Sequence, residues 1–355
     1  MKIKKLVKHV LISALAISIF MVAYYFVYLY CGYQRIADVE FPTVEKNTEA
    51  VVSSTDTVSF MTYNIGFGAY SKDYSFFLDG GEYARAFSRD DVENNVNGAI
   101  EVIGEYSPDI IVMQEVDVKG TRSYGVNQAE IIKMAFADYN SGFAVNYDSP
   151  YYLYPLSEPI GKNKSGIMTL SKYSIEMYRR NSLPVEEGLE KYLDLDRCFT
   201  VSRIPVDNNK KLMVYNVHLS AYTKDGSLSD RQLEVLLESV KKEYDRGCYV
   251  VILGDFNKDL LIDSGEYFKR PDEEYNWAKP INTSLLPSYM SVVTDTETPT
   301  CRNANKAYVG DGTDFVITID GALVSDNIEV VTVKTVDTGF KYSDHNPVYF
   351  EFKLK

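Results

Sequence analysis

Acidic, amide and histidine side chains recur at the ends of short apolar runs in this chain, in six places. They are Asn64 in MTYNI, Glu115 in DIIVMQE, Asn216 and His218 in MVYNVHL, Asp255 and Asn257 in GDFN, Asp320 in DGALVS, and Asp344 and His345 in YSDHNP. Taken singly, each residue could be an ordinary turn residue or a solvated strand end. Because two of only three histidines belong to this set, the six places together indicate one shared site.

These residue types suit the hydrolysis of a phosphoester by water. Glu115 offers the hard oxygen that Mg²⁺ takes together with substrate phosphate, and amides such as Asn64 and Asn257 can bind metal waters or phosphate oxygens. Asp255 can orient or deprotonate an attacking water, and histidine can serve as acid, base or charge stabiliser near neutral pH. Asp320 can hold one histidine nitrogen and fix the tautomer. Since no serine or cysteine nucleophile motif and no Walker-type loop occurs, metal-assisted hydrolysis is the predicted chemistry.

The elements that must position these residues follow from the hydrophobic pattern. Helical spacing predicts helices over residues 90–106, 128–138 and 228–244. Strand-like runs occupy residues 57–65, 109–115, 167–170, 197–204, 211–219, 249–253, 315–324, 328–336 and 348–352. Strands separated by helices, together with strands that follow one another directly, predict mixed sheets with helices outside rather than a purely parallel sheet. Rigid strand ends are where such folds assemble sites.

The N-terminus has the pattern of a membrane anchor. Four lysines open the chain, and then no Asp, Glu, Lys or Arg occurs until Arg35. The 21 apolar or uncharged residues from Val10 to Tyr30 match, as a helix, a hydrocarbon core of about 30 Å. Tyrosines gather at the far end of this run, as in an aromatic belt, and the lysines place the N-terminus in the cytoplasm.

A cleaved signal peptide is the alternative for the same segment, and a secreted protein would then result. The run is longer than the hydrophobic region of such peptides, and no small-x-small cleavage site follows it. The sequence therefore favours a single-pass anchor in the plasma membrane, with the remainder outside the cell.

The remainder of the chain divides into a short connector and one large domain. We expect residues 1–36 to form the cytoplasmic tip and anchor, residues 37–55 a polar stalk, and residues 56–355 the catalytic domain, which we expect to be monomeric. Four of the 37 basic residues precede residue 34, so the rest carries 33 basic and 50 acidic side chains, a net charge of −17. This charge argues against tight, sequence-independent binding of nucleic acid, although it leaves a metal-dependent nuclease open.

The order YN, QE, NVHL, GDFN, DGALVS and SDHNP, from about Val58 to Phe352, resembles the endonuclease/exonuclease/phosphatase (DNase I-like) superfamily, here as a membrane-anchored bacterial-type member. The resemblance implies a four-layer α/β sandwich, with two mixed sheets face to face and helices outside. It also implies Mg²⁺- or Mn²⁺-dependent cleavage of a phosphoester.

The matching motifs imply roles for individual residues. Glu115 would hold the metal with Asn64 and Asp344 beside it, and Asp255 would position or activate the water. Asn257 and His218 would bind the scissile phosphate, and His345, paired with Asp320, would be the general base or the electrostatic stabiliser. The division of labour between Asp255 and His345 stays open.

The substrate is not fixed by these motifs. The loop from Tyr70 to Arg89 is long and aromatic, and it would be either a substrate wall or simple loop packing. Candidate phosphate contacts are Asn163, Lys164 and Arg197. No basic stripe for duplex DNA and no long apolar hairpin for membrane insertion stands out, so nucleic acid, phospholipid and sugar phosphate all remain possible substrates. The competing function is a non-catalytic binding or adhesion domain that retains the fold.

Overall fold

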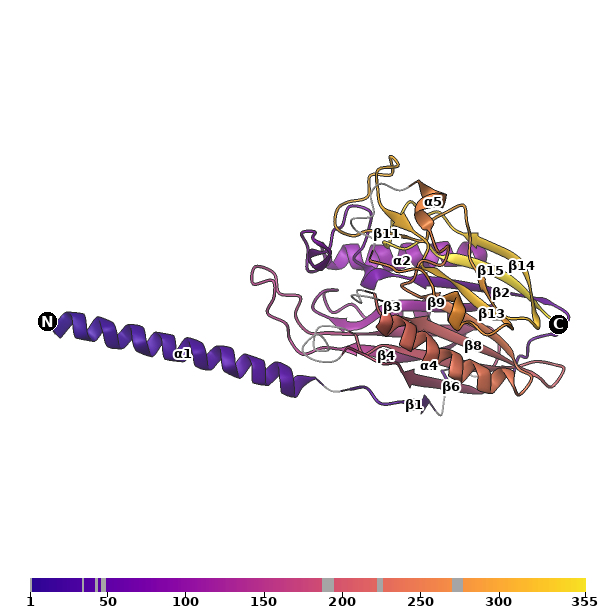
Figure 1. Ribbon diagram of the computed structural model, residues 1–355, viewed down its shortest axis with the longest axis horizontal. Coiled ribbons are helices and arrows are strands. Elements are labelled where there is room, and N and C mark those ends of the chain that lie inside the picture. The colour runs from indigo at the N-terminus through magenta and orange to yellow at the C-terminus, as the bar shows by residue number, and fades with distance from the viewer. Residues whose placement is uncertain are drawn as a thin grey trace.

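The computed structural model describes residues 2–33, 35–41, 44–45, 49–186, 195–221, 226–269 and 277–355. Two mixed β-sheets form the centre of the domain (Figure 1). The seven-stranded sheet has the order β1 (Val39–Phe41), β6 (Met177–Ser182), β7 (Cys198–Pro205), β8 (Lys211–His218), β9 (Tyr249–Asp255), β13 (Asp320–Ser325) and β10 (Met290–Val293). The six-stranded sheet has the order β14 (Ile328–Thr335), β15 (Val348–Leu354), β2 (Thr57–Asn64), β3 (Ile110–Gly120), β5 (Asn163–Ser171) and β4 (Asn140–Asp148).

Helices cover the outer faces of both sheets. Helices α2 (Arg89–Tyr106) and α3 (Gln128–Ala135) pack against the six-stranded sheet, and α4 (Ser227–Tyr244) packs against the seven-stranded sheet. Figure 1 shows α2 and α4 on opposite sides of the strands. The short helix α5 (Ser264–Phe268) lies beside a two-stranded ribbon of β11 (Cys301–Arg302) and β12 (Val316–Ile317). The four-layer α/β sandwich predicted from the sequence is confirmed.

Alternation along each strand separates the hydrophobic core into three layers. In β2, Val58 and Phe60 face the other sheet, whereas Met61 and Tyr63 face the helices. In β8, Leu212 belongs to the layer between the sheets and Met213 to the layer under α4. Both faces of the central strands are therefore buried, which explains why these strands read as continuous apolar runs.

Two parallel contacts stand out among the described strands. Strand β2 runs parallel to β3, and β8 runs parallel to β9, while the other named neighbours are antiparallel. Each parallel pair is joined by a helix, α2 in the first case and α4 in the second. The carboxyl ends of β2, β8 and β9 consequently carry the residues that the sequence analysis singled out.

Helix α1 (Lys2–Gly32) extends away from the domain, with the N-terminus at its far end (Figure 1). Residues 3–32 have a mean hydropathy of 2.4 in their most apolar window, and none of that window is buried. The helix is thus long and apolar enough to cross a membrane or to be a signal sequence, and only its C-terminal end, at residues such as Leu29, packs against the domain.

The segment that the sequence analysis expects to be a polar stalk, residues 37–55, contacts the domain at several of its described residues. Strand β1 pairs with β6 at the edge of the seven-stranded sheet, and the side chain of Val52 is buried beside Val206. Residues 42–43 and 46–48 of this segment lie outside the described residues. The connector therefore lies against the domain at these points.

Candidate active site

Strand alternation explains why four of the predicted residues meet. Asn64, His218, Asp255 and Asp320 stand at strand ends in the same alternation phase as the residues that fill the space between the two sheets. Asp255 is directly opposite His218 on β8 and Asp320 on β13. A polar site thus closes one end of the apolar layer between the sheets.

Glu115 reaches the same place by a different route. The sequence analysis placed it at the end of a strand, but β3 continues to Gly120. The pairing of β3 with β5 shifts between Met113 and Val116, and Glu115 has a φ of 56°. This bulge re-aims the side chain, and Glu115 consequently lines the cleft described below.

Glycine at position 254 allows β8 and β9 to lie close enough for the site. Gly254 has a φ of 146°, and a Cβ atom there would lie 2.1 Å from the backbone oxygen of Val217. Any larger residue would force apart the two strands that carry His218 and Asp255. The glycine of GDFN is therefore a structural requirement of the site.

Asp255 lies at the centre of the polar contacts. Asn64 Nδ2 donates to Asp255 Oδ2 at 3.0 Å, and His218 Nε2 and His345 Nε2 lie 3.5 Å and 3.9 Å from the same oxygen. The backbone N–H of Asn257 donates to Oδ1 at 2.8 Å. Burial and then the charge of Asp320 raise the pKa of Asp255 to about 7, so this carboxyl is poised to exchange a proton near neutral pH.

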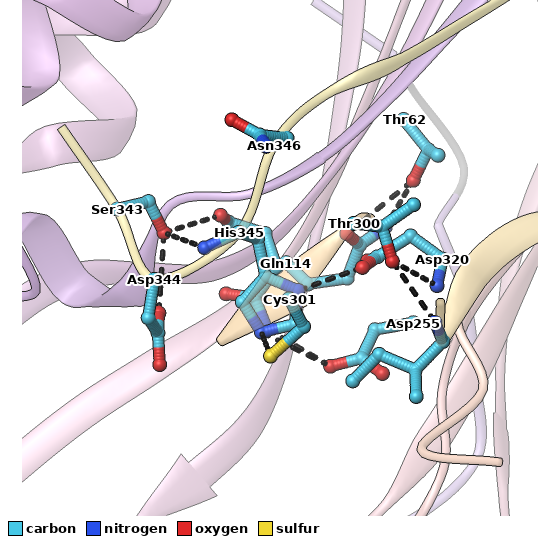
Figure 2. A network of polar contacts seen from close by, with 12 residues as sticks. Thr62, Gln114, Asp255, Thr300, Cys301, Asp320, Ser343, Asp344, His345 and Asn346 are labelled. Carbon is cyan, nitrogen blue, oxygen red and sulfur yellow. Dashed lines mark hydrogen bonds and ion pairs between the residues drawn. The ribbon is translucent and has the colours of Figure 1, made fainter. Parts of the chain in front are cut away.

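His345 is held by Asp320. The Nδ1 atom of His345 lies 2.8 Å from Asp320 Oδ2, and Figure 2 shows the ring between Asp320 and the thiol of Cys301. Thr300 Oγ1 accepts hydrogen bonds from the backbone N–H groups of residues 319 and 320 and so fixes the start of β13. Burial lowers the pKa of His345, but Asp320 outweighs this effect and holds it well above its ordinary value. The charge of Asp320 therefore favours the imidazolium form of the ring.

The pKa of His218 shifts in the opposite direction from that of His345. Burial, reinforced by the positive charge of Arg197, lowers the pKa of His218 well below its ordinary value. Its Nε2 atom faces the carboxylates of Asp255 and Glu115, at 3.5 Å and 4.0 Å. The neutral imidazole can thus donate a hydrogen bond through Nε2 without carrying charge.

Two carboxylates suit a divalent cation. Burial raises the pKa of Asp344 to about 6, against the charges of His345 and Arg302, and the negative charge of Glu115 adds to the rise. Both Asp344 and Glu115 line the same cleft. Figure 2 shows the carboxyl of Asp344 turned away from the His345–Asp320 pair. A hard cation between Asp344 and Glu115 would offset their repulsion, so the donor set fits Mg²⁺ or Mn²⁺.

Asn64, predicted beside the metal, presents its amide nitrogen to the carboxylates. Its Oδ1 atom accepts the backbone N–H of Gly66 at 3.0 Å, and this bond fixes which way the amide points. Nδ2 then donates to Asp255 and, at 3.4 Å, to Glu115 Oε1. In this arrangement Asn64 orients two carboxylates.

A second cluster of potential ligands consists of Asp255, Asp320 and His345, whose donor atoms lie within 4.8 Å of one another. One carboxylate oxygen of Asp320 is already bonded to the histidine ring. We therefore interpret this cluster as a proton-handling group, adjacent to the pair formed by Glu115 and Asp344.

Glu115, His218, Asp255, Asn257, Asp344 and His345 line one cleft of about 530 Å³, whereas Asn64 and Asp320 lie behind them and are not among its lining residues. Tyr70, Phe76 and Leu78 from the long loop after β2 form part of its wall. Tyr70 and Phe76 also pack against each other and against Phe67. The aromatic loop, for which the sequence left substrate wall and loop packing open, thus packs on itself and also lines the cleft.

The three candidate phosphate contacts are distributed differently. Arg197 is buried and lines the cleft. Asn163 is buried at the start of β5, where its amide donates to the backbone of Ile160 and accepts from the backbone of Arg122. Lys164 pairs with Asp148 at 3.4 Å. Neither Asn163 nor Lys164 is among the cleft residues.

Sequence reasoning missed several cleft residues. Arg122 forms a buried ion pair with Asp117 and lies over the ring of Phe67. Arg302, also buried, donates to the backbone oxygens of Ser71 and Tyr74 and ties the aromatic loop to the site. Trp277 and Cys301 also line the cleft. None of them stands beside one of the six motifs, so only the fold brings them to the cleft.

A known protein family and several solved structures resemble this chain. The profile of the endonuclease/exonuclease/phosphatase family matches residues 61–345. No curated protein sequence matches the chain significantly. An endonuclease/exonuclease/phosphatase from Beutenbergia cavernae is similar in structure, with a TM-score of 0.59 and 18% identity over 84% of this chain and 72% of that one.

Two further solved structures share the fold. ANGEL2, described as a 2′,3′-cyclic phosphatase and solved with adenosine-2′,3′-vanadate, has a TM-score of 0.55 and 15% identity over 90% of this chain and 99% of that one. A functionally unknown conserved protein from Enterococcus faecalis has a TM-score of 0.54 and 16% identity over 84% of this chain and all of that one. At these identities the likeness concerns the fold, whereas the profile match covers most of the chain. The chain therefore belongs to the endonuclease/exonuclease/phosphatase family.

Proposed function

We propose that this protein is a divalent-metal-dependent phosphoester hydrolase that is exported and tethered to the membrane by α1. The observation that carries the proposal is the convergence of Glu115, Asp344, Asp255 and the His345–Asp320 pair on one cleft. Members of the family act on phosphoesters. The structure of ANGEL2 contains adenosine-2′,3′-vanadate, an analogue of a phosphate ester. Both observations support the same class of reaction for this chain.

Asp255 is the group best suited to take a proton from the attacking water. Its pKa of about 7 matches the working pH of such a base. His345 is protonated because Asp320 faces it, so it is suited to stabilise negative charge on the phosphate rather than to accept a proton. We therefore propose Asp255, rather than His345, as the base, a choice that the sequence leaves open.

His218, Asn257 and Arg197 suit binding of the phosphate itself. His218 is neutral and faces the carboxylates through Nε2, and Arg197 contributes a positive charge to the cleft wall. Asn257 Nδ2 donates one N–H to the backbone oxygen of Leu219 at 2.8 Å, which orients the amide, and the second N–H of Nδ2 is the group that can donate to a phosphate oxygen. Glu115 and Asp344 would hold the metal, which as a Lewis acid supplies polarisation of the phosphate oxygens.

Turnover of a water-soluble ester tests the proposal. The full-length chain in detergent should hydrolyse bis(p-nitrophenyl) phosphate with Mg²⁺ or Mn²⁺, and EDTA should abolish the reaction. Glu115→Gln and His218→Gln should lower kcat/KM by roughly 10²-fold or more. Glu176→Gln, which only breaks an exposed pair with Lys211, is the matched control. No turnover by the folded wild type would instead favour a non-catalytic domain that keeps the fold.

A further inference from the structure

The loop between β4 and β5 carries an apolar tip. Tyr152 and Gly161 exchange two backbone hydrogen bonds of 3.1 Å, which close the base of this loop. Beyond the base, Leu153 is 42% exposed, Tyr154 67% and Leu156 84%. Such exposure of large apolar side chains in one loop marks an interaction surface.

The exposed apolar tip joins the cleft. The rings of Tyr154 and Phe77 lie 5.7 Å apart between centroids. Leu78, the next residue, is 64% exposed and also lines the cleft, as does Ile160 at the base of the loop. We refer to Leu78, Tyr151, Leu153, Tyr154 and Leu156 as the apolar rim.

The apolar rim also joins the end of α1. The hydroxyl of Tyr25 accepts the backbone N–H of Leu153 at 2.9 Å and donates to the backbone oxygen of Tyr151 at 3.2 Å. The hydroxyl of Tyr28 accepts the N–H of Tyr151 at 3.0 Å. Tyr25 and Tyr28 belong to the tyrosine-rich end of α1, which is where the polar and apolar parts of a bilayer meet if the helix spans it.

We propose that the apolar rim inserts into the outer interface of the membrane, beside the tyrosine-rich end of α1. The cleft would then open onto a phosphoester carried by a membrane lipid. This inference rests on the proposed function, since it needs both the tether and the hydrolase. Three features support it: the rim is continuous with α1, the rim borders the cleft, and the exposed side chains are the aromatic and aliphatic types that such interfaces accept. One acid, Glu158, lies in the loop between Tyr152 and Gly161, so little charge opposes insertion.

Tryptophan quenching tests the surface independently of turnover. Full-length Leu156→Trp is reconstituted in vesicles of phosphatidylethanolamine and phosphatidylglycerol that include brominated lipid. The emission added by the new tryptophan should be quenched. Val331→Trp, at an exposed position on β14, should be quenched far less. Equal quenching at both positions, or none at residue 156, would overturn the proposal.

Lipid hydrolysis tests the substrate class. Leu156→Asp should lower the release of phosphorylated headgroup from these vesicles by roughly tenfold or more, and it should leave turnover of bis(p-nitrophenyl) phosphate unchanged. Val331→Asp should change neither rate. Turnover of the soluble ester without any release from the vesicles would overturn the lipid substrate, whereas loss of both reactions in the wild type would count against the proposed function instead.

Discussion

The carboxyl group of Asp255 contacts polar side chains that belong to both sheets, and it lies between them. Its partners come from β2, β8 and the loop before β15. Burial among them makes ionisation of Asp255 costly. At the scale of the residue, the protonation of Asp255 therefore depends on burial and Asp320, which raise its pKa, and on His345, which lowers it.

The pH dependence of stability should reveal this cost. In EDTA, the folded-state pKa of about 7 for Asp255 lies above its unfolded value of about 4. The folded chain therefore holds an extra proton between these values, and stability falls as pH rises through this window, by roughly 3 kcal/mol. Asp255→Asn lacks the charge, so its melting temperature should rise relative to wild type between pH 5 and pH 8. A constant difference across this range would contradict the assignment.

The pairing of His345 with Asp320 predicts a second residue-scale effect. Asp320→Asn removes the charge that keeps His345 protonated, so the pKa of His345 should fall, and activity should drop by roughly 10²-fold or more. A pH–rate profile and NMR titration of the ring measure both effects. Asp326→Asn, at the other end of the same strand region, is the control. An unchanged pKa of His345 would show that Asp320 does not keep the His345 ring protonated.

Six polar residues of the cleft could be predicted because they belong to motifs at strand ends: Glu115, His218, Asp255, Asn257, Asp344 and His345. Arg122 and Cys301 could not, since their positions depend on where loops fold back. Glu115 was found by type, but the bulge that aims it has no sequence pattern of its own. The raised pKa of Asp344 depends on burial and neighbours from several elements, which only the folded chain defines.

At the scale of the element, α2 packs against the loop that carries Asp344 and His345. A Cβ atom on Gly98 would lie 2.2 Å from the ring of Tyr342. Gly104, in the same helix, has no atom within 4 Å of that position. The contact between Gly98 and Tyr342 therefore couples a helix to the site, two residues from Asp344.

Alanine at the two glycines should have opposite effects. Gly104→Ala should stabilise the protein by about 1 kcal/mol through helix propensity. Gly98→Ala should be destabilising by about 1–3 kcal/mol, because the Tyr342 ring must move, and it should lower activity as well. Thermal melts and ester turnover of both variants provide the comparison. Similar gains in stability for both would mean that the packing of Tyr342 is unimportant.

The helices α2 and α4 agree with the prediction to within one residue at each end, because their apolar spacing is regular and each has a clear stop. Strands β1, β4, β6, β10 and β11 were not predicted. Polar residues make up most of β6 and interrupt the apolar residues of β4, so the register of these two strands depends on backbone pairing rather than on a clear hydrophobic pattern.

At the scale of the whole molecule, the charge and α1 define how the protein meets its surroundings. The net charge of −13 averages a basic tip and an acidic remainder. If α1 spans the membrane, the protein should resist extraction by alkaline carbonate. An immunoblot against the N-terminal residues should then detect the full-length chain in the membrane fraction. A shorter, soluble species would instead indicate cleavage as a signal peptide.

The dependence of turnover on Mg²⁺ concentration tests the central claim most directly, because it separates metal binding from proton transfer. Wild type should saturate with Mg²⁺ and lose activity in EDTA. Asp344→Asn should raise the Mg²⁺ concentration at half-saturation, whereas Asp255→Asn should lower kcat by roughly 10²-fold or more with little change in that concentration. A wild-type rate that is indifferent to EDTA, or a full rate in Asp255→Asn, would contradict the account.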